Sequence, residues 1–381
     1  MTGQPPWDRS LDAAELVIVG AGIVGLAHAV DAVSRGLSVV VVERDERAVG
    51  ASVRNFGHGC FTAQDGAALR YAMAARTAWL RLAKEAGLWT EEGGTVVVAR
   101  AEDEYAVLEE FAAARDDQAV LLDAGRVAER VPVGPGVVGG AWLPLDVRVD
   151  PRQAVHAIAA WLAGRGVRFH WGTSAHLVEP GLVTTSRGRI RAGHVILAVG
   201  HDVDRHFPGL AERAGLRRCV LRMLRVADPH GRRVEPAVLS GFSLLRYDGF
   251  RACPTLPALR ARLERERPAL TGIGLNLMFT QRPDGDLSIG DTHAYAVTPE
   301  PFDDDELDRH VLAETAGLLG AGRLAVRERW RGVYASAPDP FLIAAPMPGV
   351  RVVSVTSGIG MTTALGLAPE VLDDLLATNT M

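Results

Sequence analysis

The chain has 381 residues, of which 48% are hydrophobic, so it can bury two hydrophobic cores or one core with a large insertion. The net charge of −5 and the isoelectric point near 6.1 give no electrostatic reason to expect binding to nucleic acid or to an anionic membrane. The three cysteines form no CxxC pair, which argues against a disulfide framework, predicts no metal site and suits a reducing compartment.

The N-terminal segment has no basic stretch followed by an apolar one. The apolar run over residues 16–30 is short and interrupted by glycines, so neither a signal peptide nor a membrane-spanning helix is expected. We therefore expect a cytoplasmic protein without a membrane partner.

Residues 16–43, LVIVGAGIVGLAHAVDAVSRGLSVVVVE, combine a buried strand, a glycine turn, a helix, a second strand and an acid. Gly20 permits the sharp turn, Gly22 lets the backbone approach a pyrophosphate, and Gly25 lets the helix pack closely on the sheet. The first helical residues, Ile23 and Val24, then face the phosphates. The segment therefore predicts a dinucleotide-binding unit.

Glu43 ends the second strand, 18 residues after Gly25. A carboxylate there accepts both hydroxyls of an adenosine ribose and repels the 2′-phosphate of NADP. This motif alone leaves open whether the dinucleotide is FAD or NAD.

The next region contains a polar loop, ERDERAVGASVRNFGHGCFTAQDG, followed by a predicted helix over residues 66–86. GTVVVA reads as a strand, residues 102–115 as an amphipathic helix, and VPVGPGVVGG as turns. Asp150-Pro151 predicts a helix start, and this helix extends to about Gly164. A strand, a hairpin and a buried strand ending at Gly200 follow, as in the second half of a nucleotide-binding fold.

Residues 217–324 differ in pattern and are predicted to contain the substrate domain. They include the basic strand RRCVLRMLR, the segment LLRYDGF, a charged helix over 257–267 and alternating strands through LNLMFTQ and DLSIGDTHAY. The acidic PFDDDELDRH opens a helix, and we interpret its carboxylates as a solvated helix start.

The last segment, VRVVSVTSGIGMTTALGLAPEVLDDLLA, leads a strand through Gly358 and Gly360 into a final helix that starts near Met361. A nicotinamide enzyme has no particular need for this second glycine turn. A reduced flavin does, because a helix N-terminus stabilises negative charge around N1 and O2. Two such turns at opposite ends of the chain favour FAD.

These residues resemble the D-amino acid oxidase superfamily of FAD-dependent oxidoreductases, which includes glycine oxidase and sarcosine oxidase, over essentially the whole chain. The resemblance rests on VIVGAGIVGLAHA, Glu43, Gly50-Ala51-Ser52, HVILAVG and VTSGIGMTTALGLA. It implies an α/β protein with a glutathione-reductase-like Rossmann FAD-binding domain and a second, mixed α+β substrate domain. The expected FAD-binding domain is discontinuous, over 1–90, 150–215 and 325–381, and the substrate-binding domain comprises 91–149 and 216–324.

Within that superfamily, GASVRNFGHG, LLRYDGF, LSIGDTHAY, ERWRGVYAS and VTSGIGMT resemble a subfamily associated with aminophosphonate catabolism. The resemblance implies FAD-dependent oxidation of a 2-aminoethylphosphonate derivative, including N-alkylated forms, with oxygen reduced to hydrogen peroxide. Tyr334 stands where amino acid oxidases of the superfamily carry a carboxylate-binding arginine, which places an ordinary α-amino acid in doubt. The terminal flavin region has no cysteine, so noncovalent FAD is expected.

The candidate residues follow from this reading. A phosphonate dianion requires arginine or lysine, and arginine is preferred for its forked donors. Arg54 is the preferred anion ligand because it lies between the flavin loop and Asn55, while the other arginines are equally compatible with surface positions. The substrate-binding candidates are Arg54, Asn55, Gln64, Arg222, Arg225, Arg246, Tyr247 and Arg331. The catalytic candidates are His58, which would orient or deprotonate the amine, with His293 and Tyr334 as substrate contacts.

The candidate cofactor contacts are taken from both glycine turns, the polar loop and the ends of the buried strands. Val178 is included for backbone contacts to adenine. They are Gly20, Gly22, Ile23, Val24, Gly25, Glu43, Arg44, Ala51, Ser52, Asn55, Gly57, Val178, Ala198, Gly200, Gly358, Gly360, Met361 and Thr362.

Other functions are compatible with the same motifs. The first alternative is an FAD-dependent amino acid oxidase or dehydrogenase that uses a glycine-like or sarcosine-like substrate or passes electrons to another acceptor. The second is a flavin-binding protein without catalysis. Oligomeric state does not follow from the sequence.

Overall fold

The protein was analysed as a computed structural model that describes residues 9–377. One half of the molecule is built on five parallel strands, of which β2, the last four residues of β1 and the last three of β12 are apolar runs buried on both faces, and most of β19 is also buried. In spatial order they are β19 (Val350–Ser357), β12 (Gly188–Leu197), β1 (Ser10–Val19), β2 (Val39–Val42) and β9 (Arg168–His170).

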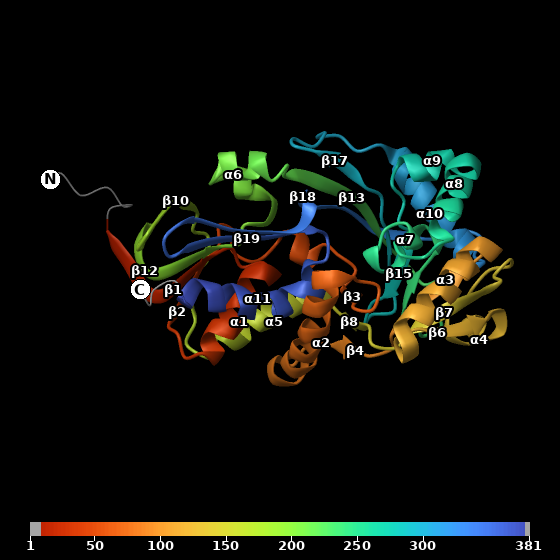
Figure 1. Cartoon of the computed structure of the whole chain (residues 1–381), viewed down its shortest axis with the longest axis horizontal. Coiled ribbons are helices and arrows are strands. Elements are labelled where there is room, and N and C mark those ends of the chain that lie inside the picture. Colours follow the sequence, from red (N-terminus) through yellow and green to blue (C-terminus); the bar gives the residue numbers. More distant parts are fainter. Residues whose placement is uncertain (1–8, 378–381) are drawn as a thin grey trace.

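Alternation along β1 divides the core into two layers. Leu16 and Ile18 pack against one set of helices, whereas Val17 and Val19 face the opposite layer. Figure 1 shows the first set together on one side of the sheet, namely α1 (Ile23–Ser34), α2 (Gly66–Ala86), α5 (Pro151–Ala163) and α11 (Gly360–Ala377). The opposite layer contains the hairpin of β10 (Ala175–Glu179) and β11 (Leu182–Thr185), the 3-10 helix η4 (Gly200–Arg205) and α6 (Pro208–Arg213).

The 22-residue strand β18 (Val326–Met347) extends this sheet into the other half of the molecule. Its first part pairs with β13 (Arg217–Val226) and its second part with β19. Beyond β13 follow β16 (Leu287–Gly290), β15 (Met278–Gln281), β14 (Ala237–Leu239), β5 (Thr95–Ala99), β7 (Gly139–Leu143) and β6 (Val120–Asp123), while β17 (Ala294–Ala296) also pairs with β13.

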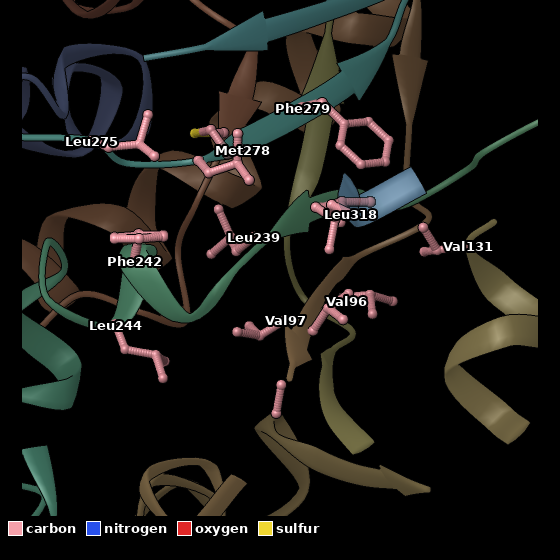
Figure 2. Close-up of a cluster of buried hydrophobic side chains, with 14 of the residues drawn as sticks. Val96, Val97, Val131, Leu239, Phe242, Leu244, Leu275, Met278, Phe279 and Leu318 are labelled. Carbon is pink, nitrogen blue, oxygen red and sulfur yellow. The ribbon is translucent and has the colours of Figure 1, made fainter. Parts of the chain in front are cut away.

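Helices and a third hydrophobic cluster complete this half. Figure 2 shows part of that cluster, in which Val96 of β5, Leu239 of β14 and Phe279 of β15 come together. The helices are α3 (Glu102–Arg115), α4 (Ala124–Arg130), α7 (Gly241–Leu244), α8 (Leu256–Glu266), α9 (Pro268–Gly272) and α10 (Asp305–Leu319), with the 3-10 turns η3 (Asp116–Gln118) and η5 (Asp248–Phe250).

A small separate sheet positions the polar loop that follows β2. Its strands are β3 (His58–Gly59), β8 (Val147–Val149) and β4 (Thr90–Glu91), and the 3-10 helix η2 (Ala51–Val53) precedes it. Antiparallel pairing of β3 with β8 holds His58 against the segment that begins at Asp146.

The α/β class and the helices expected over 66–86 and 102–115 and after Asp150 are confirmed. The domain boundaries stay a prediction, because one sheet continues through both halves. Among the described residues, no helix has the length and apolar character needed to cross a membrane.

Close packing between α2 and α11 fixes the start of α11. A Cβ on Gly366 would lie 2.1 Å from the Tyr71 carbonyl oxygen, and Trp79 Nε1 donates to the Met361 carbonyl oxygen (2.8 Å). We expect Gly366→Ala to destabilise the protein by about 1–3 kcal/mol, because the helices must separate. The check is a lower urea midpoint at an unchanged m-value.

Gly272→Ala is the matched control, because a Cβ there meets no atom within 4 Å. It should leave the midpoint unchanged or raise it slightly. Equal midpoints for both variants would show that the α2–α11 contact is looser than described.

Candidate functional site

A cavity of about 580 Å³ is lined by residues from both halves of the molecule. Its lining includes the ends of β1, β2 and β12 and the first glycine turn. It also includes residues of β13, β15 and β18, the segments that contain Arg246 and His293, and the second glycine turn, whose Ser357 and Gly358 contact Arg246 and Tyr334.

The first glycine turn has the geometry that the sequence predicts. Gly20 has φ +107°, and a Cβ there would lie 2.4 Å from the Ala198 carbonyl oxygen. Gly22 precedes α1 without a capping side-chain hydrogen bond, so the helix N-terminus opens on the cavity. Gly25 does not line the cavity, because its close neighbour is the Gly20 carbonyl, 1.9 Å from an added Cβ. Its role is packing.

Polar groups beside this turn are held by short hydrogen bonds. Glu43 accepts from the backbone N–H groups of Ala21 (2.8 Å) and Asp45 (3.2 Å) and faces the cavity. Ser52 Oγ accepts from the Ile23 N–H (2.9 Å), so this first-turn donor of α1 already has a partner within the chain. Arg44 Nη1 donates to Asp202 Oδ2 (2.6 Å).

The second glycine turn also lines the cavity, close to the start of α1, since a Cβ on Gly360 would lie 3.7 Å from Ile23 Cγ2. Gly358 has φ +78°, and a Cβ there would lie 2.9 Å from the Tyr334 ring. Helix α11 begins at Gly360, so its N-terminus also opens on the cavity, together with Met361 and Thr362.

These features fit FAD. Two helix N-termini suit a pyrophosphate and a reduced flavin, and Glu43 suits a ribose. Of the cofactor candidates, those that line the cavity are Gly20, Gly22, Ile23, Val24, Glu43, Arg44, Ala51, Ser52, Asn55, Ala198, Gly200, Gly358, Gly360, Met361 and Thr362.

Two other cofactor candidates lie behind the wall. Val178 is buried in the cluster beneath the hairpin, and Gly57 packs on the Val149 carbonyl, 1.9 Å from an added Cβ. Neither lines the cavity, so we correct both, like Gly25, to packing positions. Asn55 lines the cavity, but its side chain is hydrogen-bonded within the loop. It donates to the Ala51 and Ser52 carbonyls and accepts from the Gly57 N–H.

Arg246 is a cation of the cavity wall beside the second glycine turn. Its Nη2 donates to Tyr334 Oη (3.1 Å) and to the Ser357 carbonyl oxygen (2.7 Å), and its Nε donates to His293 Nε2 (3.3 Å). Within residues 9–377, its Nη1 makes no hydrogen bond and no carboxylate lies within 4.0 Å of the guanidinium. Burial raises the pKa of Tyr334 well above its ordinary value, which keeps the phenol neutral.

Both ring nitrogens of His293 have hydrogen-bond partners. Its Nδ1 lies 2.8 Å from the Gly274 carbonyl oxygen and must carry the proton, so Nε2 is the acceptor for Arg246. Burial lowers the pKa of His293, and the Arg246 charge adds to this effect against the opposing effect of Asp291. His293 is therefore positioned to orient Arg246 rather than to take a proton.

The other arginine candidates, Arg222, Arg225 and Arg331, lie outside the cavity wall, which corrects the sequence interpretation. Arg222 pairs with Asp303 (2.6 Å) and Asp308 (2.9 Å), and Arg331 also pairs with Asp303. Arg225 pairs with Asp286 and Glu328. Asp308 is 2% exposed, so the acidic start of α10 is not simply solvated, contrary to the sequence-based expectation, but neutralises strand arginines.

Gln64 also lies outside the cavity wall and is buried, with Nε2 donating to the Cys60 carbonyl oxygen (2.8 Å). Arg54 does line the cavity but is exposed, and its Nη1 donates to the Arg331 carbonyl oxygen (3.3 Å). Tyr247 and His58 line the cavity beside Met278 and Cys60.

The polar wall residues that sequence reasoning missed include Asn276 and Asp291. Asn276 Nδ2 donates to Asp291 Oδ1 (3.0 Å), and burial raises the pKa of Asp291. The available signal was a polar residue at the edge of each apolar strand, in LNLM and SIGD.

Comparison with known proteins extends these observations. One component of the opine oxidase from Rhizobium meliloti is 26% identical over 222 residues, which cover 51% of this chain and only 58% of that protein. The structure of L-proline dehydrogenase from P. horikoshii has a TM-score of 0.78 at 20% identity, covering 95% of this chain and 93% of that one. Glycine oxidase from Bacillus cereus ATCC 14579 has a TM-score of 0.77 at 17% identity, covering 96% and 95%.

The structural likenesses show the fold, and they agree with the expected D-amino acid oxidase-like architecture. The whole sequence from residue 15 to residue 373 matches one protein family, described as FAD dependent oxidoreductase (DAO). The chain therefore belongs to the DAO family of FAD-dependent oxidoreductases.

Proposed function

We propose that the protein oxidises the C–N bond of a small amine that carries an anionic group, with 2-aminoethylphosphonate and its N-alkylated derivatives as the substrate class. The product is an imine, which water hydrolyses to an aldehyde and an amine or ammonia, while oxygen is reduced to hydrogen peroxide. The observation that carries the proposal is Arg246, a cation in the cavity wall without a carboxylate partner among the described residues.

An unpaired cation at a partly buried site is costly unless a ligand supplies the opposite charge. The guanidinium of Arg246 is held in place by Tyr334, His293 and Ser357, which leaves Nη1 for an incoming anion. By contrast, Arg222, Arg225 and Arg331 already have carboxylate partners. The charge distribution thus supports one anion subsite beside the second glycine turn.

Tyr334 supports a phosphonate rather than an α-carboxylate. In the superfamily that the sequence resembles, amino acid oxidases have an arginine at this strand position, whereas here a neutral phenol stands beside the guanidinium of Arg246. A tetrahedral phosphonate has three oxygens and accepts hydrogen bonds from several directions, which suits mixed donors from different elements.

Bound FAD supplies the hydride acceptor for this chemistry. The chain itself orients the substrate: Arg246 holds the anionic end, and the start of α11 at Gly360 faces the cavity beside it. The enclosing walls from β13, β15 and β18 keep bulk water away while the amine is oxidised.

An amino acid oxidase or dehydrogenase with another electron acceptor is the second candidate. The similarity in fold to a glycine oxidase and to an L-proline dehydrogenase favours it. Peroxide release in air, measured beside reduction of an artificial dye, separates oxygen from other acceptors.

The first test is the visible spectrum of the purified holoenzyme without oxygen. We expect 2-aminoethylphosphonate or its N-methyl form to bleach the flavin, because Arg246 places the anion and directs the amine toward the cofactor. Glycine should bleach it far more slowly. Faster bleaching by glycine or sarcosine would show that the substrate is an amino acid rather than an aminophosphonate. A flavin that no amine bleaches would contradict amine oxidation as the reaction.

Arg246→Met should weaken the apparent affinity for the aminophosphonate by about 2 kcal/mol, the scale of a lost charged hydrogen bond. A neutral amine of similar length should lose much less. Arg54→Met is the matched comparison, since Arg54 is exposed and should have the smaller effect. A larger effect at Arg54, with an unchanged flavin spectrum in both variants, would move the anion subsite to the polar loop.

Gly22→Val should give colourless protein, because side-chain atoms at this position occupy the space into which the pyrophosphate must fit. The ratio of flavin to protein absorbance after purification measures the effect, with Gly272→Ala as the control. Retention of a full complement of flavin by Gly22→Val would show that the pyrophosphate lies elsewhere.

A further inference from the structure

A carboxylate lies in the cavity wall close to the guanidinium of Arg246. Asp291 follows β16 and lines the cavity, and its side chain is 7% exposed. Arg246 Nε lies 3.3 Å from His293 Nε2, and Asp291 Oδ2 lies 3.9 Å from the same nitrogen. Within the described part of the chain, Arg246 and Asp291 form no ion pair at 4.0 Å or less. Two opposite charges therefore face one part of the cavity without neutralising each other directly.

The neighbours of Asp291 fix its side chain through one oxygen only. The backbone N–H of Asp291 donates to the Asn276 carbonyl oxygen (2.9 Å), and the Asn276 N–H donates to the Asp291 carbonyl oxygen (2.8 Å). Asn276 Nδ2 donates to Asp291 Oδ1 (3.0 Å). Oδ2 accepts no hydrogen bond from any other residue between 9 and 377. His293 Nε2 cannot supply one, because its lone pair accepts from Arg246.

The second oxygen of Asp291 has access to the cavity. Among the described residues, the side-chain polar atoms that are both enclosed and without a partner include Asn276 Oδ1 and His58 Nδ1, but neither oxygen of Asp291. A carboxylate oxygen that is largely withdrawn from water and lacks a donor costs free energy. A ligand that donates to Oδ2 from the cavity removes this cost.

The other carboxylates of the cavity wall have partners beside the first glycine turn. Glu43 accepts from two backbone N–H groups. Asp45 and Asp202 lie 3.7 Å and 2.6 Å from Arg44. Asp291 differs from these three described residues, because its available oxygen lies near His293 and the anion subsite.

We propose that Asp291 Oδ2 binds the positively charged amino group of the substrate while Arg246 binds its anionic group. This assignment rests on the proposed function, and it narrows the substrate class to zwitterions whose two charged groups are a few atoms apart. The N–H groups of the ammonium supply the donors that Oδ2 lacks, and each charge of the wall gains an opposite partner. An N-methyl amine keeps N–H donors and fits the same subsite.

The electrostatics of Asp291 agree with a cationic ligand. Burial raises the pKa of Asp291, whereas His293, Arg246 and Asn276 oppose this effect. A bound ammonium adds a further positive charge beside Oδ2, which favours the ionised carboxylate. Ligand binding and ionisation of Asp291 therefore reinforce each other.

The alternative role for Asp291 is to balance the charge of Arg246 at longer range. The two roles predict opposite responses when the carboxylate is neutralised. A counterion of Arg246 opposes every approaching anion, so its removal strengthens the binding of anions with and without an amino group. A ligand of the ammonium favours only the anion that carries an amino group, so its removal weakens that ligand alone.

The first test compares two isosteres in the native holoenzyme, with the flavin reduced in advance and oxygen excluded so that the amine is not oxidised. Propylphosphonate has the shape of 2-aminoethylphosphonate, with a methyl group in place of the ammonium. Titration calorimetry should give a dissociation constant about 10- to 100-fold lower for 2-aminoethylphosphonate, the scale of a charged hydrogen bond. Equal dissociation constants would overturn the ammonium subsite.

The second test repeats both titrations with Asp291→Asn, which removes the charge but keeps the size of the side chain and an oxygen that can accept from Asn276. The dissociation constant of 2-aminoethylphosphonate should rise about 10- to 100-fold, and that of propylphosphonate should stay the same or fall. A fall for both ligands would make Asp291 a counterion of Arg246. No change, or an equal rise for both, would make its role structural. Each of these outcomes overturns the proposal.

Asp150→Asn is the matched control. The Asp150 side chain is 2% exposed, but it caps α5 and does not line the cavity. Asparagine is as good an N-cap as aspartate, so this variant should keep the fold and both native dissociation constants. Flavin content and the thermal midpoint report on the fold of each variant, and the comparison of isosteres in the native protein depends on no variant.

A second pair of isosteres, β-alanine and butanoate, separates failure of this inference from failure of the proposed function. If the phosphonates do not bind, but β-alanine binds more tightly than butanoate and Asp291→Asn removes the difference, the ammonium subsite stands and the phosphonate assignment falls. If the phosphonates bind without preference for the amine, only the ammonium subsite falls. A holoenzyme that binds no member of either pair would overturn both.

Discussion

The strand β18 sets the geometry on which the rest of the site depends. It is hydrogen-bonded to β13 over its first half and to β19 over its second, so one strand contributes to both halves of the molecule. Tyr334 pairs with Cys219 of β13 near the end of the first part and meets Gly358, where a Cβ would lie 2.9 Å from its ring. The position of Tyr334 beside the second glycine turn is therefore set by a sheet.

The same strand pair explains how positive charge is distributed. Arg222 of β13 and Arg331 of β18 are paired in register and project to the side where α10 begins, so Asp303 neutralises both. Arg246 enters from a different element and meets a phenol, an imidazole and a carbonyl, none of which carries a full negative charge. Arg222 and Arg331 are thus paired directly with a carboxylate, whereas Arg246 forms no such ion pair and interacts with the Asp291 carboxylate of the cavity wall at longer range.

Local signals in the sequence predicted much of this fold. The segment 16–43, Asp150-Pro151 and the final glycine turn each define an element through short-range sterics and capping, so their positions were predictable. The face of β13 on which an arginine lies, and the carboxylate with which it pairs, depend on long-range strand register. For that reason the sequence ranked Arg54 above Arg246. Asn276 and Asp291 were missed because a lone polar residue beside an apolar run has no distinctive spacing.

Two histidines of one cavity wall have different surroundings. His293 Nδ1 donates to the Gly274 carbonyl oxygen and its Nε2 accepts from Arg246, and burial and that guanidinium lower its pKa against the opposing effect of Asp291. His58 Nε2 lies 2.7 Å from Thr95 Oγ1 and 3.4 Å from Asp146 Oδ2, whereas its Nδ1 is buried with no hydrogen-bond partner among the described residues. The fixed neighbour of the first ring is thus a guanidinium and that of the second is a hydroxyl beside a carboxylate, so the two imidazoles cannot have interchangeable roles.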